Sequence, residues 1–149
     1  MWDNEISTVI GAPVEDTYSY LADFPRHKEW SVGVADLAPV SNGHVGVGAE
    51  FAASETVPMK FASRAHVVAL EPPRLIAWEA TDGQLMRVEW TLELSPDAGG
   101  GTRLVERSHW RPRNVLGGAI LRLWRTRRIP DENRQSLERL KAILEAGSA

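Results

Sequence analysis

The sequence predicts an α+β fold, in which a curved seven-stranded sheet packs around a long C-terminal helix and short helices lie near the N-terminus. Three observations predict it. Segments with alternating apolar residues follow one another through the middle of the chain, a short helical segment precedes them, and a long one follows them. Because a curved sheet around a single helix tends to leave a cavity, an apolar small-molecule site is the leading functional hypothesis.

The first strand and the first helix are separated by a change of period near residue 12. Residues 2–10 alternate, with Ile6 and Ile10 on the apolar face, which suits a half-buried strand. Pro13 fits the first turn of a helix, where its missing N–H costs nothing. The Phe24-Pro25 pair ends this helix, because the residue before a proline is pushed out of helical geometry.

Six further strands are expected at 32–40, 49–56, 61–70, 75–81, 86–94 and 102–110. Turns between them are marked by Asn42-Gly43, Pro72-Pro73 and Asp82-Gly83. The clearest alternation lies in residues 86–94, which place apolar side chains on one face and charged side chains on the other.

The last predicted element is a helix from about 114 to 145. Apolar residues recur at helical spacing in both of its halves. Pro130 lies between the halves and removes a backbone donor, so a kink or a short break is expected there. Asp131 and Glu132 could cap the second half.

Composition indicates an ordinary soluble domain. The chain has 149 residues, 43% of them hydrophobic and 25% charged, and we expect one domain covering residues 1–149. No apolar run approaches the roughly 20 residues that cross a bilayer, and the start of the chain lacks a signal-peptide pattern. The absence of cysteine excludes disulfides, thiolate nucleophiles and cysteine-ligated metals, and it fits a cytoplasmic protein.

The charge distribution bears on partners. A net charge of −3 argues against nucleic acid. Residues 111–128 nevertheless hold six arginines and no acidic residue: Arg111, Arg113, Arg122, Arg125, Arg127 and Arg128. This block could contact an anionic membrane, an acidic partner or an anionic ligand, and we place a possible peripheral membrane contact at Arg122 to Arg128. The alternative is a solvated helix face whose arginine stems cover apolar surface. The sequence does not set the oligomeric state.

Several short motifs resemble the polyketide cyclase/dehydrase group of the SRPBCC, or START-like, superfamily. They are IGAP at 10–13, YLAD at 20–23, EWS at 29–31, VGVGA at 45–49, EPPRL at 71–75, GTRL at 101–104 and SLERLK at 136–141. The resemblance implies a helix-grip fold, with an antiparallel seven-stranded sheet wrapped around a long helix and a deep apolar cavity. It implies no single activity, because the group includes cyclases, dehydratases and carriers of lipids and quinones.

No residue pattern indicates a metal, a cofactor or covalent catalysis. The four histidines show no metal-ligand spacing, and the glycines at 43, 46 and 48 are not followed by the residues of a phosphate loop. No serine has the flanking glycines of a nucleophile elbow. We therefore expect neither a metal nor a cofactor.

Two residues are candidates for acid–base chemistry in the cavity, Glu106 and His66. If Trp90 faces inward, the neighbouring strand would point Glu106 inward as well, where desolvation would raise its pKa and suit it to proton transfer. The alternative is an outward Glu106 paired with an arginine. The same question of register applies to Glu55 and to His66, for which a purely structural histidine is the alternative.

The expected ligand-binding residues combine these polar groups with large apolar side chains. The set is Phe51, Glu55, His66, Trp78, Trp90, Glu106, Trp110, Leu116, Ile120 and Trp124. For the tryptophans the alternative is plain core packing, which fits Trp2 and Trp30 better.

Two functions are compatible with these features. In one, the protein binds or carries a hydrophobic molecule such as a lipid, a quinone or a polyketide-like compound. In the other, it is a cofactor-independent polyketide cyclase or dehydratase, in which a cavity residue moves a proton.

Overall fold

The computed structural model describes residues 2–40, 46–55, 61–82, 85–124 and 128–147. Its elements, in chain order, are β1 (Trp2–Ile10), α1 (Val14–Ala22), the short 3₁₀ turn η1 (Phe24–Arg26), α2 (His27–Trp30), β2 (Val34–Pro39), β3 (Glu50–Glu55), β4 (Phe61–Glu71), β5 (Leu75–Asp82), β6 (Met86–Pro96), β7 (Thr102–Pro112), α3 (Val115–Trp124) and α4 (Arg128–Gly147). The seven predicted strands are confirmed, with ends that differ by at most two residues.

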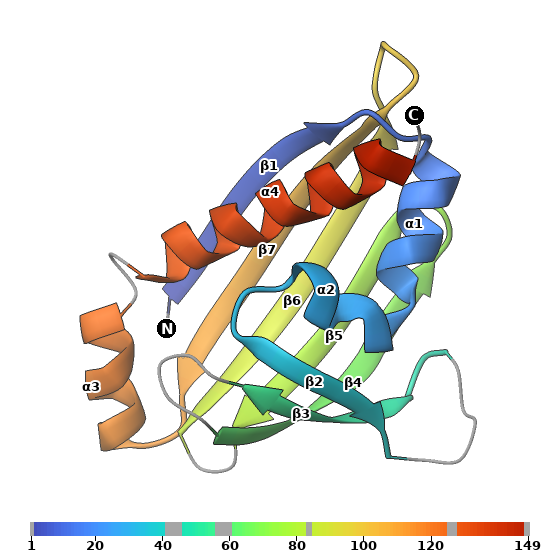
Figure 1. Cartoon of the computed structure of the whole chain (residues 1–149). Coiled ribbons are helices and arrows are strands. Elements are labelled where there is room, and N and C mark those ends of the chain that lie inside the picture. The colour runs from blue at the N-terminus through green and yellow to red at the C-terminus, as the bar shows by residue number, and fades with distance from the viewer. Residues whose placement is uncertain (1, 41–45, 56–60, 83–84, 125–127, 148–149) are drawn as a thin grey trace.

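All seven strands form one antiparallel sheet in the order β1-β7-β6-β5-β4-β3-β2. The first strand therefore lies beside the last, with Ile6 opposite Glu106. Helix α4 crosses one face of the curved sheet, and α1 and α2 cover the same face (Figure 1). This arrangement confirms the predicted helix-grip α+β fold.

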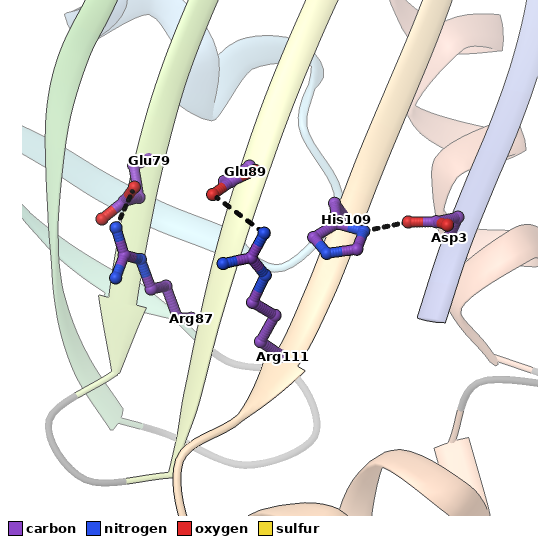
Figure 2. Close-up of polar contacts among 6 residues, drawn as sticks. All are labelled: Asp3, Glu79, Arg87, Glu89, His109 and Arg111. Carbon is purple, nitrogen blue, oxygen red and sulfur yellow. Dashed lines mark hydrogen bonds and ion pairs between the residues drawn. The ribbon is translucent and has the colours of Figure 1, made fainter. Parts of the chain in front are cut away.

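The two faces of the sheet differ in chemistry. On β6, Met86, Val88, Leu92 and Leu94 are buried on the face beneath the helices, as their alternation predicts. Polar residues of β6 and its neighbours form cross-strand contacts on the opposite face. Figure 2 shows ion pairs of Arg87 with Glu79 and of Arg111 with Glu89, and a hydrogen bond between His109 and Asp3. Exposed pairs of this kind contribute little to stability, but an outer face that is charged on four neighbouring strands specifies which side of each strand faces the core.

Helix α4 is held in place by hydrogen bonds near its middle and near its C-terminus as well as by its apolar stripe. Its buried side chains include Leu137 and Leu140, which join the main core. Near its C-terminus, Glu145 accepts a hydrogen bond from the Gly11 backbone N–H at 2.9 Å. Nearer its N-terminus, Ser136 Oγ accepts one from the Val32 backbone N–H at 2.8 Å. The helix is thereby fixed across the sheet, and the space between the two is set.

The C-terminal region contains a break, as predicted, but it has two distinct helices rather than one kinked helix. Helix α3 ends at Trp124 and α4 begins at Arg128, so Pro130 lies in the first turn of α4. A proline is tolerated there because the N–H groups of that turn have no partner within the helix. Pro130 therefore accompanies the start of α4, and α3 points in a different direction beyond the end of β7 (Figure 1). Among the described residues, no helix combines the length and apolarity needed to cross a membrane.

Candidate functional site

A cavity of about 120 Å³ lies between the inner face of the sheet and helices α2 and α4. Strands β2 to β7 supply its floor, α2 and the start of β2 one wall, and the first two turns of α4 another. The sheet face and the fixed position of α4 thus bound this cavity.

Three tryptophans form the aromatic floor of the cavity, as predicted for Trp78, Trp90 and Trp110. Trp78 and Trp90 are opposite each other on β5 and β6, and their rings lie nearly parallel with centroids 6.0 Å apart. Trp110 on β7 meets Trp90 edge-on at 5.7 Å. Because the side chains project from adjacent strands on one face, they form a continuous aromatic surface in which the Trp110 ring is tilted against the other two.

A second aromatic group faces them from η1 and α2. Phe24, His27 and Trp30 recur at three-residue intervals, so they share one face of this helical segment, and all three line the cavity. Phe24 meets Trp78 edge-on at 5.5 Å. None of the three belongs to the ligand-binding set expected from the sequence, although their regular spacing is readable there.

His27 acts as a member of this second aromatic group and not as a charged residue. Its Nε2 lies 2.8 Å from the Leu21 carbonyl oxygen, which can only accept, so Nε2 carries the proton. Burial lowers the pKa of His27 to about 4 despite that hydrogen bond. The ring is therefore neutral at physiological pH.

Glu106 faces inward from β7 and is almost completely buried, with 2% of its surface exposed. Desolvation raises its pKa from 4.5 to about 8. Its Oε1 atom has no hydrogen-bond partner within the described part of the chain. The alternative of an outward Glu106 paired with an arginine is wrong, and near neutral pH this carboxyl group is mostly protonated and able to donate.

Three other buried polar atoms around the cavity also lack a partner among the described residues. They are Trp30 Nε1 on α2, Ser63 Oγ on β4 and Asn133 Nδ2 on α4. Each can donate a hydrogen bond, and so can protonated Glu106. Buried donors usually have a hydrogen-bond partner, so these four groups, all on residues that line the cavity, are available to an acceptor atom of water or of a bound molecule.

Several residues expected at the site lie elsewhere. His66 is exposed on the outer face of β4, because Ala65 and Val67 take the inward positions on either side of it. Phe51 is buried in the core, stacked on Phe24 at 5.3 Å, and does not line the cavity. Phe51 therefore lies behind Phe24, which separates it from the cavity.

Leu116 and Ile120, expected at the site from the C-terminal region, do not line the cavity either. Leu116 is 62% exposed, because it lies on a different side of α3 from the buried Gly117 and Leu121. Ile120 is half-buried and packs on a second apolar cluster beside the cavity, with Met86, Trp110 and Leu121 among its members. The side chains of Glu55 and Trp124 lie outside the described residues.

Across the described ranges, no three His, Cys, Asp or Glu side chains gather closely enough to hold a metal ion. The polar groups that line the cavity are hydrogen-bonding groups and two carboxyl groups, those of the partly buried Glu132 and of Glu106, and burial raises the pKa of Glu106 to about 8. The chemistry that this arrangement offers is recognition of an oxygen-bearing apolar molecule and proton transfer at one position.

The sheet, the long helix across it and the aromatic-walled cavity between them define a helix-grip protein. The family described as "Polyketide cyclase / dehydrase and lipid transport" matches residues 1–145, and the chain belongs to it. No curated protein matches the sequence significantly.

Solved structures with the same fold include aromatase/cyclases. The chain is similar to the Zhui aromatase/cyclase of a Streptomyces species, with 12% identity, a TM-score of 0.80 and coverage of 99% of this chain and 96% of that one. It is similar to the protein TTHA0849 of Thermus thermophilus, with 19% identity, a TM-score of 0.77 and coverage of 99% and 100%. It also matches the di-domain ARO/CYC StfQ of the steffimycin biosynthetic pathway, with 20% identity, a TM-score of 0.74 and coverage of 98% of this chain and 52% of that one. At these identities the likeness concerns the fold.

Proposed function

We propose that the protein binds a hydrophobic small molecule that carries carbonyl or hydroxyl oxygens, of polyketide-like or quinone-like chemistry, in the cavity beneath α4. The observation that carries the proposal is the set of four buried donor groups around an aromatic-walled cavity. Membership of a polyketide cyclase/dehydrase and lipid transport family supports it.

The donors favour an oxygen-bearing ligand over a plain hydrocarbon chain. A buried donor without a partner costs about 1–3 kcal/mol, and a hydrocarbon would leave all four unpaired. A carbonyl oxygen accepts from Trp30, Asn133 or protonated Glu106 while its ring lies on the tryptophan floor. Polar recognition and apolar contact then act on the same molecule.

The size of the cavity sets which part of the ligand it encloses. A dry cavity of about 150 Å³ is known to take benzene, so about 120 Å³ suits a single ring. Val32, Val34 and Glu132 are among the less buried lining residues, at the side of the cavity formed by α2, β2 and α4. The remainder of a larger ligand is expected to extend past them.

Acetophenone and ethylbenzene form a matched pair of probes, because they share a ring and differ in the carbonyl oxygen. We expect acetophenone to bind at least fivefold more tightly, since its oxygen satisfies a buried donor. Titrations followed by the indole N–H signals in ¹H–¹⁵N NMR spectra measure both affinities.

The control for this experiment compares the substitution of the buried Glu106 with the same substitution of an exposed glutamate. Glu106→Met removes the buried donor and is expected to narrow the difference between the two probes. Glu50→Met replaces an exposed glutamate of β3 and is expected to leave it unchanged. Equal affinities of the unmodified protein for both probes would contradict an oxygen-recognising cavity.

Mass spectrometry of protein purified from its native host addresses the natural ligand. An apolar adduct that copurifies with the protein and is lost on denaturation would identify the class of that ligand.

Catalysis by Glu106 is the second candidate, favoured by its burial inside the cavity and its raised pKa. A cyclase or dehydratase without a cofactor needs one group to move a proton while the cavity orients the chain. Ionised Glu106 would remove a proton from the carbon beside a carbonyl, and the neighbouring donors would stabilise the enolate oxygen that forms.

Exchange of the acetophenone methyl protons for deuterium tests this second candidate. The reaction needs the ionised carboxylate, which is about a tenth of the total at pH 7 for a pKa near 8. We therefore expect the protein-catalysed exchange rate, followed by NMR, to rise by up to about tenfold between pH 7 and pH 9 and to level off.

The variant Glu106→Gln is expected to lose the catalysed exchange and to retain acetophenone binding, because its amide still donates a hydrogen bond. If the unmodified protein binds acetophenone but exchanges its protons no faster than buffer does, the catalytic candidate fails and the binding function stands.

A further inference from the structure

Helix α3 presents its apolar side to the outside of the molecule. Val115, Leu116 and Leu123 are 92%, 62% and 83% exposed, and Ala119 and Arg122 are exposed between them. At 100° per residue, these five residues span about 120° of the helix circumference. A surface helix of a globular domain normally shows the reverse pattern, with its polar side outward.

The contacts of α3 fix this orientation. Asn114 Oδ1 caps the helix by accepting a hydrogen bond from the Gly117 N–H at 2.7 Å. The Arg113 N–H donates to the Leu85 carbonyl oxygen at 2.8 Å. Gly117 packs so closely on Leu85 that a Cβ atom there would lie 2.0 Å from the same oxygen. The glycine side of the helix is therefore locked against the sheet, and the apolar side cannot turn inward.

The segment that contains this apolar face carries positive charge and no negative charge. Residues 107–130 contain no aspartate or glutamate. Arg122 lies on the face itself, and Arg128 is exposed at the start of α4. Neither forms an ion pair with another residue of the described ranges. The surface thus combines exposed leucine and valine with unneutralised arginine.

We propose that α3 docks on an anionic lipid surface, with Val115, Leu116 and Leu123 entering the boundary between headgroups and acyl chains and Arg122 and Arg128 contacting lipid phosphates. Interfacial helices with an apolar face and flanking arginines bind membranes in this way. The proposal does not depend on which ligand the cavity holds.

A second copy of the chain fits this surface poorly. The helix is about 15 Å long and its exposed face is roughly 10 Å wide, so the face covers about 150 Å². This area is far below the roughly 800 Å² that each partner buries in a stable dimer. A symmetric contact across this face would also place Arg122 of each copy beside an apolar interface, whereas lipid phosphates complement that charge.

Vesicle flotation tests the proposal. The intact protein is expected to float with phosphatidylcholine vesicles that contain about one third phosphatidylglycerol, and to float less with pure phosphatidylcholine or in about 0.5 M salt. Leu116→Ser with Leu123→Ser is expected to weaken vesicle binding at least tenfold. Arg122→Ser with Arg128→Ser should do the same, since each arginine near an anionic surface is worth about fivefold.

Matched controls replace the same residue types on the outer face of the sheet. Val68→Ser and Arg103→Ser change exposed residues of β4 and β7 and are expected to leave binding intact. The proposal is overturned if the intact protein fails to bind anionic vesicles, or if the α3 variants bind as well as the controls. It is also overturned if sedimentation velocity shows a dimer that the leucine variants abolish while vesicle binding is absent.

Discussion

Replacing Glu106 by glutamine is expected to stabilise the protein at alkaline pH. A folded-state pKa of about 8 against an ordinary 4.5 means that the folded protein holds a proton that the unfolded chain releases. The contribution of Glu106 is therefore fully favourable below about pH 4.5 and is lost as the pH rises towards 8. The loss approaches about 1.4 kcal/mol for each pH unit within this window.

Glutamine has no proton to lose, so Glu106→Gln removes this pH-dependent loss. At pH 8 we expect its free energy of unfolding to exceed that of the unmodified protein by about 2 kcal/mol, after allowing about 1–3 kcal/mol for a buried amide with an unpaired group. Below pH 5 the gain should disappear.

Urea unfolding followed by tryptophan fluorescence between pH 5 and pH 9 measures both effects. Glu50→Gln changes an exposed glutamate and serves as the control, with a pH dependence like that of the unmodified protein. Parallel curves for Glu106→Gln and the unmodified protein would show that Glu106 titrates normally in the folded state, which would remove the acid–base candidate as well.

Replacing Gly117 by alanine is expected to destabilise the protein by about 2–4 kcal/mol. The added Cβ atom would lie 2.0 Å from the Leu85 carbonyl oxygen and 2.9 Å from its carbon, which are backbone atoms and cannot rotate away. Either α3 or the Leu85 backbone must move, and the packing of Leu121 against Trp110 and Met86 is lost with it.

Gly118 supplies the matched control on the same helix. An alanine there would find only Pro112 side-chain carbons at 3.8 Å and beyond. Gly118→Ala should therefore be neutral or stabilise by up to about 1 kcal/mol, because alanine is the better helix former. Chemical denaturation of the two variants compares them directly, and equal stabilities would show that α3 does not pack tightly on Leu85.

The sheet could be predicted from the sequence because each strand carries its own signal. Alternation in residues 86–94 and turn residues such as Asp82-Gly83 depend only on near neighbours. Glu106 needed one further step, since its direction depends on the register between β6 and β7, where Leu92 lies opposite Glu106. The same reasoning failed for His66. The local sequence does not show whether His66 or its neighbours Ala65 and Val67 face the core, and a shift of one residue exchanges the two faces of a strand.

The missing parts of the site depend on long-range contacts. Asn133 is a polar residue on the apolar side of α4, a pattern visible in the sequence, but its meaning requires knowledge of what α4 crosses. Leu116 does not line the cavity as expected, because the contact between Gly117 and Leu85 sets the orientation of α3. The periodicity of the sequence does not reveal this contact. Local pattern thus predicts elements and faces, and the packing between elements decides which faces meet.

The pairing of β1 with β7 has a consequence for biosynthesis. Ile6 and Glu106 are a hundred positions apart, so the N-terminal strand has no partner until nearly three quarters of the chain has been translated. During that interval the inner face of the growing sheet lacks α4, and η1 and α2 alone cover the tryptophans of β5 and β6 on that side. Closure of so long a loop slows folding, because its entropy is lost before the contacts form. The nascent chain is therefore expected to remain on the ribosome as an incomplete sheet with an exposed, aggregation-prone apolar surface. Such a surface is a natural substrate for a chaperone that binds nascent polypeptides.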